Sequence, residues 1–101
     1  MQVELHISCR KLKDLDVFSK SDPLVYFSQW NNQLRKWVQF GVTECIQNNL
    51  NPDFKTFFTV NYQFEKMQKI RFFVVDQDLG QSFDEIGYYE TSIGNVMGSR
   101  N

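Results

Sequence analysis

The second half of the chain contains the stretch Phe72-Phe73-Val74-Val75-Asp76-Gln77-Asp78, which is the strongest indication of its fold. The first four residues are aromatic or β-branched, which is typical of a buried β-strand. The strand runs into two aspartates at positions i and i+2, whose side chains lie on one side of an extended chain. Two neighbouring carboxylates repel each other, and a hard cation between them makes the arrangement favourable. The stretch therefore predicts a strand that ends in a candidate cation site.

Short apolar or alternating runs recur along the rest of the chain, separated by clusters of Asn, Asp, Gly and Pro. The expected strands cover residues 3–9, 24–30, 37–46, 57–62, 69–75 and 87–93. In the first of them apolar residues alternate with polar ones, so one face of this strand is expected to be buried. Residues 63–68 and 93–97 are long enough for single helical turns only. This pattern predicts an all-β fold, an antiparallel sandwich or barrel of about seven strands.

The whole chain has 101 residues, of which 42% are hydrophobic and 16% aromatic. No linker divides it, so we expect residues 1–101 to form a single domain with its own core. No apolar run approaches the roughly 20 residues of a membrane-spanning helix, and the first residues do not resemble a signal peptide. Cys9 and Cys45 form no disulfide framework, and we expect both to be reduced and to lie on strands. These features predict a cytoplasmic protein.

The charged residues nearly balance, with a net charge of −1, so we expect no duplex nucleic acid as a partner. Five aspartates nevertheless fall into two loops. They are Asp16 and Asp22 before one strand, and Asp76, Asp78 and Asp84 after another. Aspartate is also a common turn residue, which alone would explain any single one of them. Taken together, the two loops indicate a shared cation site if the sandwich brings them together, and calcium is the cation that accepts ~6 to 8 oxygen ligands at flexible geometry.

The order of three motifs resembles that of C2 domains over nearly the whole chain. Residues 15–23 resemble the first calcium loop of that family, in which an Asp is followed six residues later by the Asp of a Ser-Asp-Pro triplet. Residues 48–54, with Leu50-Asn51-Pro52, are similar to the second loop, and residues 75–87 to the third. Residues 36–44 with 48–52, and residues 64–72 and 92–99, are most similar to the copine type of C2 domain.

This resemblance implies an antiparallel Greek-key β-sandwich of the C2 type with its calcium loops at one end. The family pattern has eight strands, and the last of them is apparently missing here, so the chain is expected to be a fragment of a longer protein. The open sheet edge that remains would allow dimerisation or strand exchange with another chain. The implied calcium ligands are the carboxylates of Asp16, Asp22, Asp76, Asp78 and Asp84, with the backbone carbonyls of Leu15 and Gln77.

The resemblance also implies binding to anionic phospholipid, such as phosphatidylserine, when calcium is present. Apolar residues inside the two loops are candidates for membrane contact: Val17, Phe18, Leu79 and Phe83. Phe83 fits a position folded back onto the sandwich equally well. A phosphoinositide site is not expected, because Val42 and Glu44 stand where many C2 domains that read phosphoinositides carry a lysine pair.

Charge suggests how such binding would be switched. The five loop aspartates carry −5, and the remaining seven acids and eleven bases carry +4. Two calcium ions would change the total from −1 to +3. The loop end would then attract the anionic surface that it otherwise repels, so we expect recruitment from the cytoplasm to membranes when calcium rises.

Two other interpretations compete with this one. An enzyme is not expected, because the sequence has no glycine-rich phosphate cradle and no nucleophile beside a base. A calcium-independent C2 module that binds another protein is the alternative function. His6 alternates with apolar residues and is expected to face solvent, and Trp30 and Trp37 are expected to form a cross-strand pair rather than a binding platform.

Overall fold

The computed structural model describes residues 1–12, 22–77 and 83–98. The described part contains six strands and one short helix. In chain order they are β1 (Gln2–Ser8), β2 (Pro23–Asn31), β3 (Lys36–Val42), β4 (Asp53–Asn61), β5 (Lys69–Gln77), β6 (Phe83–Ser92) and α1 (Ile93–Gly98).

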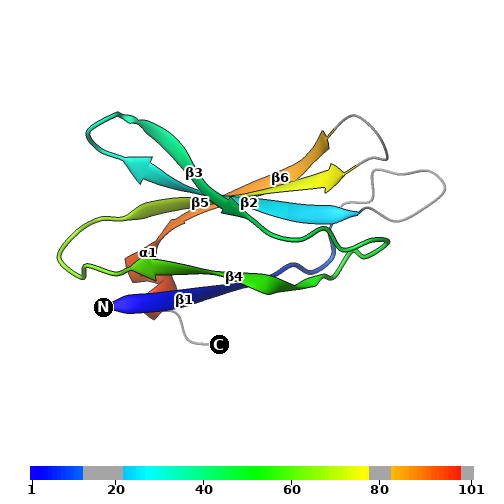
Figure 1. Ribbon diagram of the computed structural model, residues 1–101, viewed down its shortest axis with the longest axis horizontal. Coiled ribbons are helices and arrows are strands. Elements are labelled where there is room, and N and C mark those ends of the chain that lie inside the picture. The colour runs from blue at the N-terminus through cyan, green and yellow to red at the C-terminus, as the bar shows by residue number, and fades with distance from the viewer. Residues whose placement is uncertain (13–21, 78–82, 99–101) are drawn as a thin grey trace.

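The strands form two antiparallel sheets that lie one above the other in Figure 1. One sheet consists of β1 and β4, and the other has the order β3-β2-β5-β6. The chain crosses between the sheets after β1, β3 and β4, while β2 and β3 form a hairpin and so do β5 and β6. The expected antiparallel β-sandwich is confirmed.

Details of the elements differ from the expectation. The described residues contain six strands instead of about seven, and the strand expected at residues 37–46 already ends at Val42. Residues 63–68 form a turn without a helix, and the single turn expected at residues 93–97 is α1. Cys9 and Cys45 are free thiols, as expected, but both lie just beyond the ends of strands because the chain leaves the sheets before it reaches them.

The core lies between the sheets and is built from alternate residues of the strands. Leu5 of β1 is buried while its neighbours Glu4 and His6 are exposed, as the alternation predicts. Phe27 of β2 is fully buried, and its ring stacks on Phe58 with 4.9 Å between the centroids. Gly41 makes this packing possible, because a Cβ atom there would lie 2.6 Å from the Phe58 ring.

Candidate metal centre

The register of the four-stranded sheet brings three of the candidate aspartates to one end of the sandwich. Pro23, the first residue of β2, lies opposite Asp76 on β5, so Asp22 comes directly before this pair. Asp84 on β6 lies opposite Asp76 on its other side. Residues that are far apart in the sequence, Asp22, Asp76 and Asp84, therefore lie where β2 begins and β5 ends, at the right-hand end of Figure 1.

Asp76 has the most unusual environment of the three. It is 1% exposed, and its Oδ1 atom accepts a hydrogen bond of 2.8 Å from the backbone amide of Asp22. Its Oδ2 atom is buried and has no hydrogen-bond partner among the described residues. Burying a carboxylate oxygen without a partner is costly, so this atom marks the place where a further positive group fits.

Asp22 joins Asp76 to a third connection of the chain. The Oδ1 atom of Asp22 accepts a hydrogen bond of 2.8 Å from the backbone amide of Asn48, and its carbonyl accepts one of 3.0 Å from the amide of Gln77. Asn48 adopts the left-handed conformation, with φ of 51°, which asparagine tolerates better than most residues. The connection between β3 and β4 is thus fixed against the start of β2.

The segment that follows β1 is attached to this same connection. The backbone amide of Leu12 donates to the carbonyl of Leu50 at 2.9 Å, and that of Lys11 donates to Oδ1 of Asn51 at 2.8 Å. The guanidinium of Arg10 forms an ion pair of 2.7 Å with Asp53. The chain therefore enters the segment that carries Asp16 from the end of the sandwich where Asp22 and Asp76 lie.

The pKa of Cys45 is affected by the negative charge of the site. Its thiol donates a hydrogen bond of 3.4 Å to the carbonyl of Asp22. Burial raises the pKa of this thiol, and the nearby carboxylates of Asp22 and Asp76 raise it further, since a thiolate beside them would be repelled. Both carboxylates therefore lie close enough to the same thiol to change its pKa.

The structure describes only part of the predicted site. Asp22, Asp76 and Asp84 lie at one end of the four-stranded sheet, and Gln77 is exposed at the end of β5. Outside the described residues lie Leu15, Asp16, Val17, Phe18, Asp78 and Leu79, and the side chain of Phe83 is not described. Within the described ranges, no group of three or more His, Cys, Asp or Glu side chains is placed to hold a metal ion. The arrangement resembles an incomplete oxygen-ligand shell, and calcium, which accepts carboxylates and carbonyls at flexible geometry, fits these donors.

Two parts of the site were not predicted from the sequence. The amide of Asn48 and the thiol of Cys45 both contact Asp22, although they lie more than twenty residues away from it. An asparagine pair at residues 48–49 indicates a turn, but the partner of the turn depends on how the sheets pack.

Comparisons with known proteins agree with this architecture. Residues 2–101 match the family model described as "C2 domain". Copine-E of Dictyostelium discoideum is 44% identical over 101 residues, which cover 95% of this chain and 17% of that protein. Copine-B of the same organism is 40% identical over 107 residues, covering 99% of this chain and 20% of that protein. The chain thus spans about a fifth of the length of these curated relatives.

Solved structures share the fold at low sequence identity. A C2 domain of plant Extended Synaptotagmin 1 has a TM-score of 0.72 and 19% identity, covering 88% of this chain and 66% of that chain. Human GIVD cytosolic phospholipase A2 has a TM-score of 0.74 and 18% identity, but the match covers 91% of this chain and only 12% of the enzyme's chain. The second likeness therefore concerns a small part of the enzyme.

Proposed function

Because the chain belongs to the C2 domain family, whose members are in general modules that bind calcium, phospholipid or protein partners, we propose that it is a calcium-dependent binding module for anionic phospholipid membranes. The observation that carries this proposal is the buried carboxylate of Asp76, whose Oδ2 atom has no partner among the described residues. Asp22 and Asp84 adjoin Asp76, so a divalent cation there would satisfy a group that the described residues leave unpaired.

The proposed ligand set combines described and undescribed residues. Asp22 and Asp76 would hold the cation from the ends of β2 and β5, and Asp84 would approach from β6. The remaining donors would be the carboxylates of Asp16 and Asp78 and the carbonyls of Leu15 and Gln77. Bound calcium would supply open coordination positions for lipid phosphate or carboxylate oxygens.

Lipid and calcium would then strengthen each other's binding. Because lipid oxygens complete the coordination shell, each ligand raises the affinity for the other by the same factor. Calcium binding without lipid is expected to be weak, and membrane binding is expected to depend on calcium. In a cell this would place the protein in the cytoplasm at resting calcium and on anionic membranes when calcium rises.

Binding rather than catalysis fits the described side chains. His6, the only histidine, is exposed, and its imidazole forms a 3.1 Å contact with Glu4, away from the three aspartates. The thiol of Cys45 lies at the candidate metal centre, but its pKa is raised by burial and by the carboxylates of Asp22 and Asp76, which disfavours a nucleophilic thiolate. We therefore propose that the module has no catalytic activity of its own.

Isothermal titration with calcium tests the site directly. Asp76→Asn removes one charge of the proposed set, and we expect it to weaken calcium binding at least about tenfold, because affinity follows the number of ligand charges. Asp53→Asn is the matched control, since Asp53 is already paired with Arg10 outside the site. The proposal fails if the wild-type chain binds no calcium up to millimolar concentration, or if both variants bind it as the wild type does.

Sedimentation with vesicles tests whether membrane binding depends on calcium. Vesicles that contain phosphatidylserine should pull the chain down with calcium and release it on chelation, whereas neutral vesicles should not. Unchanged sedimentation in chelator would favour a calcium-independent module instead.

A further inference from the structure

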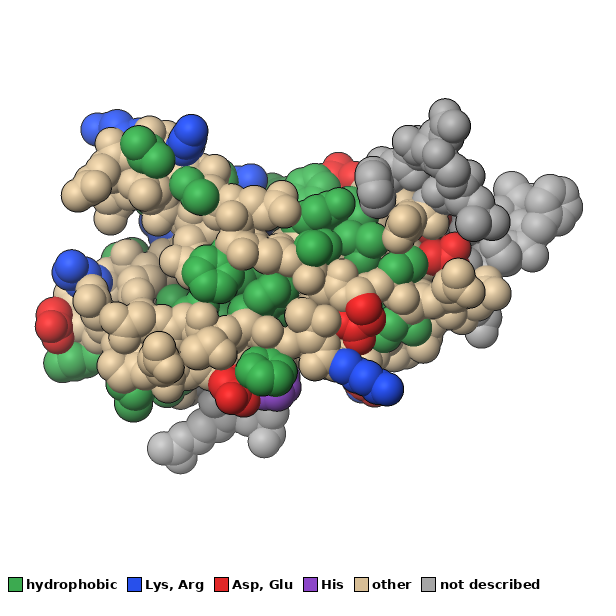
Figure 2. Space-filling model, in the orientation of Figure 1, with side chains coloured by type: hydrophobic (Ala, Val, Ile, Leu, Met, Phe, Trp, Pro, Cys, Tyr) green, Lys and Arg blue, Asp and Glu red, His purple; other side chains and the backbone are tan. Residues whose placement is uncertain are grey.

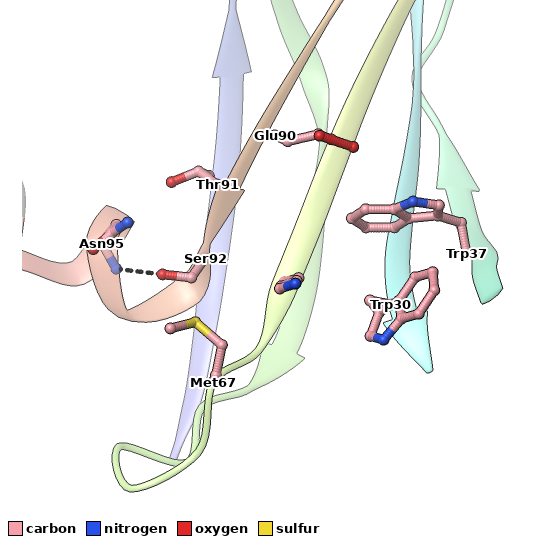
Figure 3. Close-up of a pocket in the computed structure, with 8 residues that line it drawn as sticks. Trp30, Trp37, Met67, Glu90, Thr91, Ser92 and Asn95 are labelled. Atoms are coloured by element: carbon pink, nitrogen blue, oxygen red, sulfur yellow. Dashed lines mark hydrogen bonds between the residues drawn. The ribbon is translucent and has the colours of Figure 1, made fainter. Parts of the chain in front are cut away.

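A surface pocket of about 400 Å³ lies at the end of the sandwich away from the candidate metal centre. Four strands contribute to it, together with the connection before β5 and the helix α1 (Figure 3). β2 spans the distance between the two sites, because it begins just after Asp22 and carries Trp30 near its other end. The pocket therefore lies apart from the aspartates.

Two indole rings form a corner in this pocket. Trp30 and Trp37 lie opposite each other in the β2–β3 hairpin, with 5.6 Å between their ring centroids and 73° between their planes (Figure 3). The predicted cross-strand pair is thus confirmed, but both rings also line the pocket. An angled corner fits a bulky side chain better than a flat base, which needs parallel surfaces for stacking.

The neighbouring Arg71 holds one wall in place. Its guanidinium lies 4.2 Å from the centroid of Trp37 and forms an ion pair of 2.7 Å with Glu90. Glu90 is the acidic residue that lines the pocket, and its charge is compensated by this pair. The wall is therefore preorganised, and no uncompensated negative charge lines this pocket.

Positive charge surrounds the corner. Lys69 lines the pocket, and Lys66 lines an adjoining pocket of about 480 Å³ that shares Trp30, Met67 and Lys69 with the first. Neither lysine forms an ion pair with a described residue, and the same holds for Lys36 on the hairpin. Figure 2 shows a recess between the hairpin and the connection before β5, with basic side chains on both sides.

We propose that these two pockets, the indole recess, bind an acidic peptide segment with one bulky apolar side chain. The apolar side chain would enter the corner of Trp30 and Trp37, where the flexible thioether of Met67 adapts to its shape. Flanking carboxylates would pair with Lys66 and Lys69. The hydroxyl of Thr91 and the side-chain amide of Asn95 would form hydrogen bonds with the peptide backbone. A cationic ligand would be repelled by the same lysines.

A labelled peptide tests this proposal on the full chain in the presence of chelator. The probe is a fluorescein-labelled nonapeptide with a central leucine between two runs of four glutamates. We expect a saturable rise in anisotropy that weakens with added salt. Lys66→Glu/Lys69→Glu should weaken binding about tenfold or more, because two attractive pairs become repulsive. Lys55→Glu on β4 reverses an exposed charge outside the recess and should leave the affinity within about twofold.

The two tryptophans provide a second measurement. They are the only tryptophans of the chain, so the proton NMR spectrum contains two indole N–H signals, and both should shift on addition of the peptide.

The proposal is overturned if the peptide does not bind at millimolar concentration, if lysine-flanked or glycine-centred peptides bind equally well, or if the indole signals stay in place. It is also overturned if the double lysine variant affects only calcium-free binding to anionic vesicles, which would assign the recess to lipid. Because the assay contains no calcium, its failure leaves the proposed metal site untouched.

Discussion

Asp76 and Asp84 are opposite each other on neighbouring strands but differ in their exposure to solvent. Asp76 is buried, whereas Asp84 is exposed. When a buried carboxylate loses a partner, water cannot replace that partner, so the loss costs more free energy than it does for an exposed carboxylate. We therefore expect substitution of Asp76 to affect calcium binding more than substitution of Asp84.

The reactivity of Cys45 offers a probe of this charge without calcium. Burial and the carboxylates of Asp22 and Asp76 raise the pKa of Cys45 above the ordinary thiol value, which favours the protonated thiol and slows its alkylation. Asp76→Asn removes one of the two repelling charges, so we expect iodoacetamide to modify Cys45 about two- to fivefold faster. Mass spectrometry of the two cysteine peptides measures this rate.

Cys9 serves as an internal control in the same experiment. Burial raises the pKa of Cys9, whereas the neighbouring Arg10 lowers it, and no aspartate contributes. Its alkylation rate should therefore not change in Asp76→Asn. An equal acceleration of both cysteines would indicate general loosening of the fold, and no acceleration of Cys45 would contradict the electrostatic explanation.

Glu44 gives a pH-dependent prediction. Burial of this carboxylate raises its pKa, but hydrogen bonds from the amide of Lys55 and from the hydroxyl and amide of Thr56 favour the charged form and lower the pKa to about 2. The unfolded chain has the ordinary glutamate pKa near 4.3. The stabilisation is therefore complete above about pH 4.3 and is lost as the pH falls toward 2.

We expect Glu44→Gln to lower the free energy of unfolding by roughly 1 kcal/mol at pH 7, after allowance for solvent exposure. The difference from the wild type should shrink steadily between about pH 4.3 and 3. Urea unfolding at several pH values measures it, and Glu65→Gln, which alters an exposed glutamate in the connection before β5, is the control. A difference that stays constant down to pH 3 would contradict the assigned hydrogen bonds.

Strands and their connections differ in how well the sequence predicts them. The alternation of apolar residues in β1 and the apolar run in β5 report burial directly, so both strands were placed nearly at their observed ends. The cross-strand pair of Trp30 and Trp37 followed from the turn between them. By contrast, the bonds from Asn48 and Cys45 to Asp22 depend on the packing of separate connections, which local sequence patterns do not encode.

The free edge of β1 leads to a prediction about association. Among the described residues β1 pairs with β4 alone. A trough of about 520 Å³ runs along residues 4–8 of β1 and Cys9 beyond its end, and apolar side chains of the facing sheet line it, among them Val74 and Tyr89. An unpaired edge beside an apolar trough favours the addition of another strand. We therefore expect the chain to dimerise as its concentration rises.

Proline at the free edge tests this expectation. The carbonyl of Met1 accepts a bond from the amide of Tyr62, so the alternation of the ladder directs the amide of Glu4 away from β4. Glu4→Pro removes this donor and should weaken the dimer, whereas Glu4→Ala keeps the donor and should not. Sedimentation velocity over roughly a hundredfold range of concentration measures the effect. Equal dimerisation of both variants would exclude pairing through this edge.

Two groups of charged residues lie at opposite ends of the described part of the sandwich. Aspartates lie where β2 begins, and lysines and half-buried indole rings line the pockets where β2 ends. An anionic bilayer would therefore repel one end until calcium binds there, while the other end stays free for an acidic partner. The two proposed activities use opposite ends of one strand, so each can be removed by mutation without the other.

Membrane insertion is the prediction that depends on the whole arrangement. Phe18 lies between Asp16 and Asp22 in the sequence, outside the described residues, and we propose that its ring enters the bilayer when calcium is bound. Burial of a phenylalanine ring is worth about 1.5–3 kcal/mol, so Phe18→Ala should weaken calcium-dependent binding to phosphatidylserine vesicles about 10- to 100-fold. Calcium affinity without lipid should stay nearly unchanged.

Phe64→Ala is the matched control, because Phe64 is 80% exposed in the connection before β5, at the end away from the aspartates. Its loss should not alter vesicle sedimentation. If Phe18→Ala instead reduces calcium binding in the absence of lipid, the ring has a structural role in the loop. If both variants lose membrane affinity equally, the loss is not specific to Phe18 and the proposed insertion is contradicted.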